Sequence, residues 1–359
     1  MENLVNADFW KGKKVLITGH TGFKGGWLSF WLKILGADVV GYALLPSTNP
    51  NLFQIADISR GMNSVVADVR DFAHLKKIVA QSMPEIVFHL AAQPLVRYSY
   101  VDPLETYSTN VIGTVNLLEA VRQTGGARAV VIVTSDKCYE NRESSRGYRE
   151  DDPLGGYDPY SSSKACVELV TVAYRDSFFN PADHSTHGVA LASARSGNVI
   201  GGGDWARDRL IPDVMRAFFS GEDVAIRNPQ AVRPWQHVLE PSSGYLMLAE
   251  RLWREGAKYA EAWNFGPDDS DAKPVQWIVE RVAKAWGRAG AWRLDAGEHP
   301  HETTYLRLDC SKAKERLGWR PRWTLDRALV AVSEWYRACQ AGKEIPQVML
   351  EQIAQFQRT

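Results

Sequence analysis

The chain has 359 residues, 45% of them hydrophobic, which is enough to bury a substantial core in one globular unit of two lobes. Its 42 basic and 42 acidic residues balance, which argues against nucleic acid or an acidic membrane surface as a general partner. Signal-peptide and membrane-spanning patterns and metal-ligand spacing are missing, so we expect a cytoplasmic protein without a metal, and free thiols at Cys138, Cys166, Cys310 and Cys339.

The first predicted strand, Val15–Thr18, leads into a glycine-rich turn and then a helix that ends at Gly36. Gly19, Gly22 and Gly25 let the backbone turn tightly and approach a ligand closely. The start of the helix offers free N–H groups to a pyrophosphate. However, the spacing is G-x-x-G-x-x-G rather than G-x-G-x-x-G, so the turn alone fits any α/β protein equally well.

Further strands alternate with helices through the first half of the chain. We predict them at Asp38–Ala43, Ser64–Ala67, Glu85–His89, Ala129–Thr134 and Val189–Arg195. This alternation predicts an α/β fold with a doubly wound parallel sheet, whose ligands bind at the carboxyl ends of the strands. The second strand ends with neither an acid nor an arginine for the adenosine ribose, so the choice between NAD and NADP stays open.

The segment after the fifth strand, Ser135-Asp136-Lys137, and the helix that Tyr160 and Lys164 open are the main candidates for catalysis. Tyr160 and Lys164 are four residues apart and therefore lie on one face of the helix. A tyrosine needs its pKa lowered by about 3 units to act as a base near neutral pH. A nearby lysine ammonium supplies part of that shift by stabilising the phenolate.

From residue 201 onward the alternation loosens. We predict a strand at Val224–Ile226 and helices at Arg209–Ser220, Gly244–Glu255, Val275–Trp286, Ser311–Leu317 and Leu325–Cys339. Residues 1–200 are therefore expected to form the dinucleotide-binding domain, with a returning segment near 236–267. Residues 201–359 are expected to supply mainly a smaller, mixed α/β substrate lobe.

The motifs in this order resemble the extended short-chain dehydrogenase/reductase superfamily over residues 13–320. The resemblance rests on the turn from Thr18 to Gly25, Leu90-Ala91-Ala92, Asn110 in Thr-Asn-Val-Ile-Gly-Thr, and Tyr160-x-x-x-Lys164. Within that group, Ser135-Asp136-Lys137 and Arg233-Pro234-Trp235-Gln236-His237 are most similar to nucleotide-sugar 4,6-dehydratases that act on CDP-glucose. The resemblance implies a Rossmann domain that binds NAD and a CDP-sugar substrate.

The resemblance also implies two sets of binding residues. For the cofactor they are Gly19, Thr21, Gly22, Phe23, Lys24, Gly25, Asp68, Val69, Leu90, Ala91, Ala92, Asn110, Tyr160 and Lys164. For the substrate they are Gln93, Asn198, Arg209, Arg233, Trp235, His237 and Arg307. A guanidinium binds phosphate bidentately, so Arg209 and Arg233 are the candidates for the diphosphate.

The implied reaction oxidises sugar C4, eliminates water across C5 and C6, and returns the hydride to C6, which converts CDP-glucose to CDP-4-keto-6-deoxyglucose. Tyr160 is the implied base on the C4 hydroxyl, Lys164 tunes it, and Ser135 hydrogen-bonds the same hydroxyl. Asp136 is the implied acid for the departing C6 hydroxyl. Lys137 stands where a glutamate is usual; it either acts as the C5 base, directly or through a held water or enolate, or only pairs with Asp136 and positions it.

Alternative functions remain on the same fold: another nucleotide-sugar dehydratase, an epimerase or decarboxylase, or a non-catalytic dinucleotide sensor. The Asp136-Lys137 pair argues against simple epimerisation, and the intact Tyr160 argues against a sensor. Nothing in the composition or spacing reads cytosine. The resemblance also implies a homodimer or homotetramer that pairs through the predicted helices Asp102–Gln123 and Tyr160–Phe178.

Overall fold

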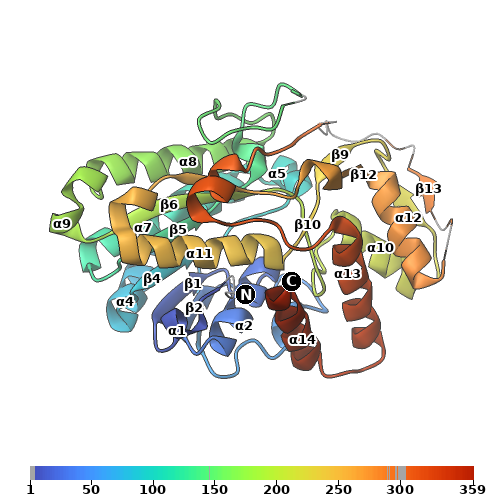
Figure 1. Ribbon diagram of the computed structural model, residues 1–359, viewed down its shortest axis with the longest axis horizontal. Helices are drawn as coiled ribbons and strands as arrows, with labels where there is room; N and C mark the ends of the chain where they lie inside the picture. Colours follow the sequence, from blue (N-terminus) through green and yellow to red (C-terminus); the bar gives the residue numbers. More distant parts are fainter. Residues whose placement is uncertain (1–4, 145, 289, 291, 296, 298–304) are drawn as a thin grey trace.

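The computed structural model describes residues 5–144, 146–288, 290, 292–295, 297 and 305–359. A seven-stranded parallel sheet in the order β11-β6-β5-β4-β1-β2-β3 forms its centre, with helices on both faces (Figure 1). The strands are β1 (Lys14–Thr18), β2 (Asp38–Ala43), β3 (Asn63–Val66), β4 (Ile86–His89), β5 (Ala129–Val133), β6 (Ala190–Ser196) and β11 (Ala262–Phe265). This confirms the predicted doubly wound α/β sheet.

Most residues of the strands are apolar because helices cover both faces of the sheet. Every residue of β5 is buried. Val130 and Ile132 pack into the cluster that contains Leu117 of α7, whereas Val131 and Val133 pack into the larger cluster on the other face. Alternate residues of one strand therefore build two cores, and the sheet between them presents its carboxyl ends to one edge.

The helices are α1 (Ala7–Trp10), α2 (Phe23–Ile34), α3 (Leu52–Ile55), α4 (Phe72–Ser82), α5 (Val96–Val101), α6 (Pro103–Tyr107), α7 (Gly113–Thr124), α8 (Pro159–Ser177), α9 (His184–His187), α10 (Leu210–Phe219), α11 (Leu239–Glu255), α12 (Val275–Trp286), α13 (Leu325–Gln340) and α14 (Ile345–Arg358). The helix predicted over Asp102–Gln123 is present as α6, a π-helical turn at Ser108–Ile112, and α7. No helix in the described ranges is both long enough and apolar enough to cross a membrane.

The second half of the chain builds a smaller lobe and also returns to the first. Short strands pair two by two: β7 (Val199–Ile200) with β10 (Gln236–His237), β9 (Val232–Pro234) with β12 (Ala272–Pro274), and β8 (Val224–Ile226) with β13 (Trp292–Leu294). Strand β11 joins the main sheet beside β6. Helix α14, which the sequence did not predict, packs on α2 through Trp31 and Phe356, whose rings meet edge to face at 5.9 Å. The domain limit at residue 200 stays a prediction.

Candidate active site

A cavity of about 840 Å³ lies where the chain leaves β5 and β6, and it extends toward α10 and β8. All five predicted catalytic residues line it, namely Ser135, Asp136, Lys137, Tyr160 and Lys164. Eight of the predicted binding residues line it as well, namely Phe23, Lys24, Leu90, Ala92, Asn198, Arg209, Arg233 and Trp235. The fold thus gathers residues more than 200 positions apart at one edge of the sheet.

The glycine-rich turn between β1 and α2 leaves no room for a side chain at Gly19 or Gly25. Gly19 has a φ of +80°, and a Cβ there would lie 2.7 Å from the amide nitrogen of Ala91. A Cβ on Gly25 would lie 2.1 Å from the carbonyl oxygen of Gly19. Gly22 is the N-cap of α2 and has no side chain to occupy the free N–H groups of the first turn. This cradle fits the pyrophosphate of a dinucleotide at the helix N-terminus.

Ser135 and Asp136 form the polar centre of the cavity, directly after β5. The Ser135 hydroxyl donates to Asp136 Oδ1 at 2.9 Å and accepts from the amide of Lys137 at 3.2 Å. Lys137 Nζ lies 3.5 Å from the same Oδ1. Asp136 Oδ2 is buried without a hydrogen-bond donor among the described residues, and Gly197 lies so close that a Cβ would be 2.9 Å from it. A buried acceptor of this kind fits a ligand that brings its own donor.

Tyr160 lies in the first turn of α8. Its ring is 8% exposed, and burial raises its pKa to about 12. A hydrogen bond with Ser135 and the positive charge of Arg209 act in the opposite direction. Arg209 is held by an ion pair with Asp204 at 2.9 Å. The structure therefore adds Arg209 as a cation that favours the Tyr160 phenolate, a role that the sequence assigned to Lys164.

Two lysines make the inner part of the cavity electropositive. Burial lowers the pKa of Lys164 to about 8, although the carboxylate of Glu168 raises it in part. Burial and the charges of Lys164 and Arg209 lower the pKa of Lys24 to about 7. The Lys24 ammonium is placed by a 3.3 Å hydrogen bond to the hydroxyl of Ser196, at the end of β6. Such a group of cations attracts an anionic ligand.

A buried ion pair that the sequence did not reveal supports the catalytic helix. Glu168 of α8 contacts Arg195 of β6 at 2.9 Å, and both side chains are at most 3% exposed. Glu168 also accepts hydrogen bonds from Ser193 at 2.6 Å and from Thr134. Arg195 donates to the Tyr139 hydroxyl at 2.7 Å. These bonds fix α8 to the ends of β5 and β6, so the separation of Tyr160 from Ser135 is set by the core.

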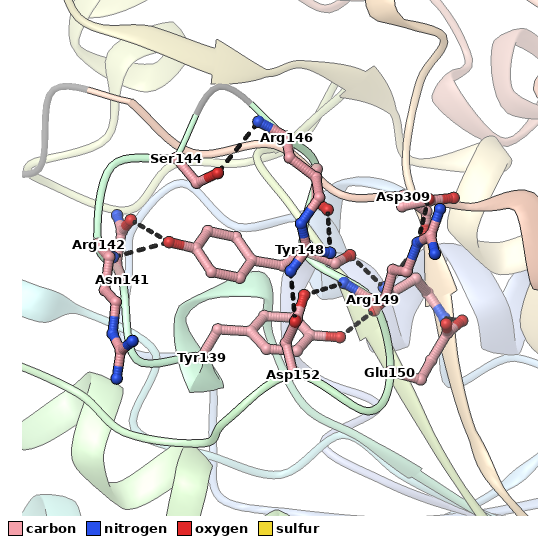
Figure 2. Close-up of polar contacts among 12 residues, drawn as sticks. Tyr139, Asn141, Arg142, Ser144, Arg146, Tyr148, Arg149, Glu150, Asp152 and Asp309 are labelled. Atoms are coloured by element: carbon pink, nitrogen blue, oxygen red, sulfur yellow. Dashed lines mark hydrogen bonds and ion pairs between the residues drawn. The ribbon is translucent and has the colours of Figure 1, made fainter.

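The polar loop that follows β5 is folded against a distant segment (Figure 2). The Tyr148 backbone donates to Arg307 O and accepts from Asp309 N, both at 2.9 Å. The rings of Tyr139 and Tyr148 stack with centroids 5.2 Å apart, and the Tyr148 hydroxyl donates to Asn141 Oδ1 at 2.9 Å. Since Tyr139 and Asn141 line the cavity, this anchoring gives one cavity wall a defined position.

Comparison with known proteins then places the chain in a family. The family model described as GDP-mannose 4,6 dehydratase matches residues 16–331. A CDP-glucose 4,6-dehydratase of Salmonella typhimurium is 58% identical over 342 residues, which cover 95% of this chain and 95% of that relative. The chain belongs to the nucleotide-sugar 4,6-dehydratases of the extended short-chain dehydrogenase/reductase superfamily.

More distant relatives share the fold of this dehydratase. A dTDP-glucose 4,6-dehydratase of Xanthomonas campestris is 24% identical over 89% of this chain and 92% of the relative. The structure of dTDP-glucose 4,6-dehydratase from Bacillus anthracis in complex with NAD superposes with a TM-score of 0.76, at 21% identity, over 93% of this chain and 99% of that chain. UDP-glucose 4-epimerase from Thermotoga maritima gives a TM-score of 0.78 at 22% identity, over 91% and 99%. At these identities the two structures establish the common fold alone.

Three predicted substrate ligands of the dehydratase, Gln93, His237 and Arg307, are absent from the cavity lining. His237 is fully buried between Trp27 and Trp323, with ring centroids at 6.0 and 4.9 Å, and burial lowers its pKa to about 3. Arg307 turns away toward the Tyr305 hydroxyl, at 2.8 Å, and the carboxylate of Asp269. His237 lies in β10, which pairs with β7, and its ring packs in the core. The pairing of the Tyr148 loop positions Arg307 through its backbone.

Other predicted residues hold the framework around the site. The Gln93 side chain bonds Thr106 and the backbone of Leu95, and Asn110 joins the Gln93 backbone to Ser163 of α8. Each of these amides satisfies buried backbone groups and therefore has no free donor for a ligand among the described residues. They connect the loop after β4 to the catalytic helix of the dehydratase.

The predicted residues on the adenosine side of the dehydratase also make contacts within the protein. The Thr21 hydroxyl donates to Leu44 O at 2.8 Å, and Asp68 forms a bidentate pair with Arg70. Val69 is buried, and a Cβ added to Gly113 would lie 2.7 Å from its side chain. Assignment of these residues to the cofactor stays a prediction. Within the cavity, the buried Oδ1 of Asn198 receives no hydrogen bond from the part of the chain that the structure describes. Arg233 donates to the carbonyl of Val232, and Trp235 donates to the carbonyl of Lys273.

Proposed function

We propose that this chain is a CDP-glucose 4,6-dehydratase that uses NAD and produces CDP-4-keto-6-deoxyglucose. The observation that carries the proposal is one cavity lined by the dehydratase set Ser135, Asp136, Lys137, Tyr160 and Lys164. The 58% identity to a CDP-glucose 4,6-dehydratase over nearly the whole chain supports the choice of substrate. The glycine cradle at α2 supports a dinucleotide cofactor.

The bound NAD would take up a hydride from sugar C4 and later give it back at C6. Tyr160 removes the proton of the C4 hydroxyl, and Ser135 hydrogen-bonds the same oxygen. Because burial disfavours the phenolate, Arg209 and the lysine pair must offset that cost when the site is closed around its ligands. The burial of Tyr160 also keeps water away from the oxygen that it deprotonates.

The elimination step falls to the residues after β5. Oxidation at C4 acidifies the C5 proton, and departure of the C6 hydroxyl needs a proton donor. Asp136 carries the acid role, since its Oδ2 is buried and has no donor among the described residues. Lys137, 3.5 Å from Asp136 and 27% exposed, is placed to remove the C5 proton or to hold Asp136 in position.

The test is a substrate panel. We expect incubation with NAD and CDP-glucose to give a 4-keto-6-deoxy product, detected by its absorbance in alkali and by the mass loss of one water. dTDP-glucose, UDP-glucose and GDP-mannose should react far more slowly. Product from another nucleotide sugar alone would contradict the CDP-glucose assignment. A 4-epimer, or the absence of product from every sugar, would contradict the dehydratase assignment for this chain.

The protein is also proposed to work in the cytoplasm as a homodimer or a dimer of dimers. Exposed apolar side chains gather on α5 to α8 and support self-association through these helices; they include Tyr98, Tyr100, Val101, Leu104, Ile112, Leu169 and Phe178. Four free cysteines agree with a reducing compartment. Sedimentation equilibrium measures the assembly, and Leu104→Asp with Leu169→Asp should produce monomers. A wild-type monomer would contradict the proposed dimer.

A further inference from the structure

The cavity continues past the catalytic cluster into a slot between α10 and β8. The walls of this slot are apolar and consist of Leu210, Pro212, Ala217, Val224 and Ile226. Charged side chains, Arg97, Asp208, Asp213 and Arg227, line the cavity in the same region. With the sugar held at Tyr160 and Ser135, the diphosphate carries the nucleoside away from the sheet edge. The slot is the apolar part of the cavity that then remains for a base.

Asp208 lies between two arginines that come from different parts of the chain. Its Oδ1 is 3.4 Å from Nη1 of Arg97, on α5, and 3.4 Å from Nη1 of Arg227, directly after β8. Both contacts end on Oδ1, and Oδ2 receives no hydrogen bond from the residues that the structure describes. Asp208 is 44% exposed along its side chain. An acceptor oxygen therefore stands in the cavity next to a guanidinium.

We propose that Asp208 and Arg227 select cytosine as the base of the nucleotide sugar. This inference rests on the proposed function and adds the residues that read the base. Cytosine presents the N4 amine as a donor beside two acceptors, N3 and O2. A carboxylate next to a guanidinium offers the matching acceptor and donors.

The same pair rejects the other pyrimidines. Uracil and thymine carry the acceptor O4 where cytosine has its amine, and the donor N3–H where cytosine has an acceptor. The carboxylate of Asp208 then faces O4, acceptor against acceptor, and Arg227 faces a donor at N3. Discrimination thus comes from repulsion of the wrong base as well as from hydrogen bonds to the right one.

In a rival assignment, Arg97 and Arg227 bind the diphosphate of the substrate. The carboxylate of Asp208 then occupies the position of the diphosphate when no substrate is bound. Arg209 argues against this rival assignment, because its charge acts on Tyr160. A candidate phosphate-binding group is therefore already present closer to the catalytic cluster. The two assignments also differ in a measurable way. A diphosphate contact changes the affinity for every nucleoside diphosphate equally, whereas a base contact changes the ratio between them.

The experiment measures the affinity of the NAD-loaded protein for CDP, UDP and dTDP by titration calorimetry. Wild type should bind CDP at least about 10-fold more tightly than UDP or dTDP. Asp208→Asn should lose most of this preference, since an amide can also donate to O4. Asn tolerates the φ of +60° at this position, so the variant should fold. The matched control is Asp223→Asn, whose carboxylate lies outside the cavity lining and faces Arg288, and which should keep the preference.

Two results would overturn the inference. One is an equal change in affinity for all three ligands in Asp208→Asn, which assigns the arginines to the diphosphate. The other is a preference for CDP that is absent in wild type or is lost in Asp223→Asn instead. The binding experiment does not measure turnover. If wild type binds CDP without preference, the base assignment is therefore overturned even when the protein dehydrates CDP-glucose. A preserved preference without dehydration overturns only the proposed reaction.

Discussion

Ser135 donates its only hydroxyl proton to Asp136 Oδ1, 2.9 Å away, and the same side chain acts on Tyr160 to lower its pKa, against the effect of burial. One hydroxyl therefore joins the acid proposed for elimination to the base proposed for oxidation. A proton given to Asp136 cannot stabilise the Tyr160 phenolate at the same time. We infer that binding of the sugar hydroxyl redirects Ser135 from Asp136 toward the reacting oxygen.

Ser135→Ala tests this link. Loss of the donor should raise the apparent pKa of Tyr160 in the pH profile of kcat, which reports the substrate complex, and lower kcat by about 100-fold. Ser135→Thr keeps the hydroxyl and serves as the control, with a profile close to wild type. An unchanged profile in Ser135→Ala would show that Ser135 does not act on Tyr160.

Lys137→Met separates the two roles of Lys137. If Lys137 removes the C5 proton, the variant should still oxidise C4, but it should stop exchanging the C5 proton with deuterated solvent. If Lys137 only positions Asp136, exchange should continue while loss of the C6 hydroxyl slows. Mass spectrometry of the recovered nucleotide sugar distinguishes these outcomes, and unimpaired exchange would remove Lys137 from the base role.

Glu168→Gln should destabilise the fold strongly. The substitution leaves the guanidinium of Arg195 buried without its counter-charge, which costs about 3–5 kcal/mol. Glu119→Gln is the matched control, because its pair with Arg122 is partly exposed and is worth about 1 kcal/mol or less. Denaturant unfolding measures both variants. Similar free energies of unfolding for the two would contradict the structural role of the Glu168–Arg195 pair.

Lys24→Met should stabilise the protein in a pH-dependent way. Burial lowers the pKa of Lys24 to about 7, while in the unfolded chain it stays near its ordinary value of 10.5. The cost of burying the ammonium is therefore complete below pH 7 and declines as the pH rises toward 10.5. The gain in Tm should be on the order of 2 °C or more at pH 6 and smaller at pH 9. Lys258→Met, at an exposed lysine, should show no such trend; a gain that grows with pH would contradict the burial of a charged Lys24.

The sequence predicted the parts of this molecule that depend on local pattern. β2, β8 and α12 lie where predicted, because apolar runs and glycine stops define them within a few residues. The five catalytic candidates share one cavity, since each follows a strand or opens a helix at the same sheet edge.

Other features depend on distant partners and left no local signal. Glu168 and Arg195 are 27 residues apart, and the Tyr148 loop pairs with a segment about 160 residues later. At His237 the motif and the packing differ, and its assignment to the substrate stays a prediction. Its motif suggested a ligand, but the strand that carries it turns the ring between two tryptophans of the core. Burial of this kind is set by tertiary packing, which a motif does not report.

One catalytic cycle of the proposed reaction moves the hydrogen of sugar C4 to C6 while water leaves. The direct measurement is the fate of deuterium in CDP-glucose labelled at C4. The account predicts a 4-keto-6-deoxy product in which the deuterium is found at C6. Product with deuterium lost to solvent, or an unreduced 4-keto sugar that retains its C6 hydroxyl, would contradict it.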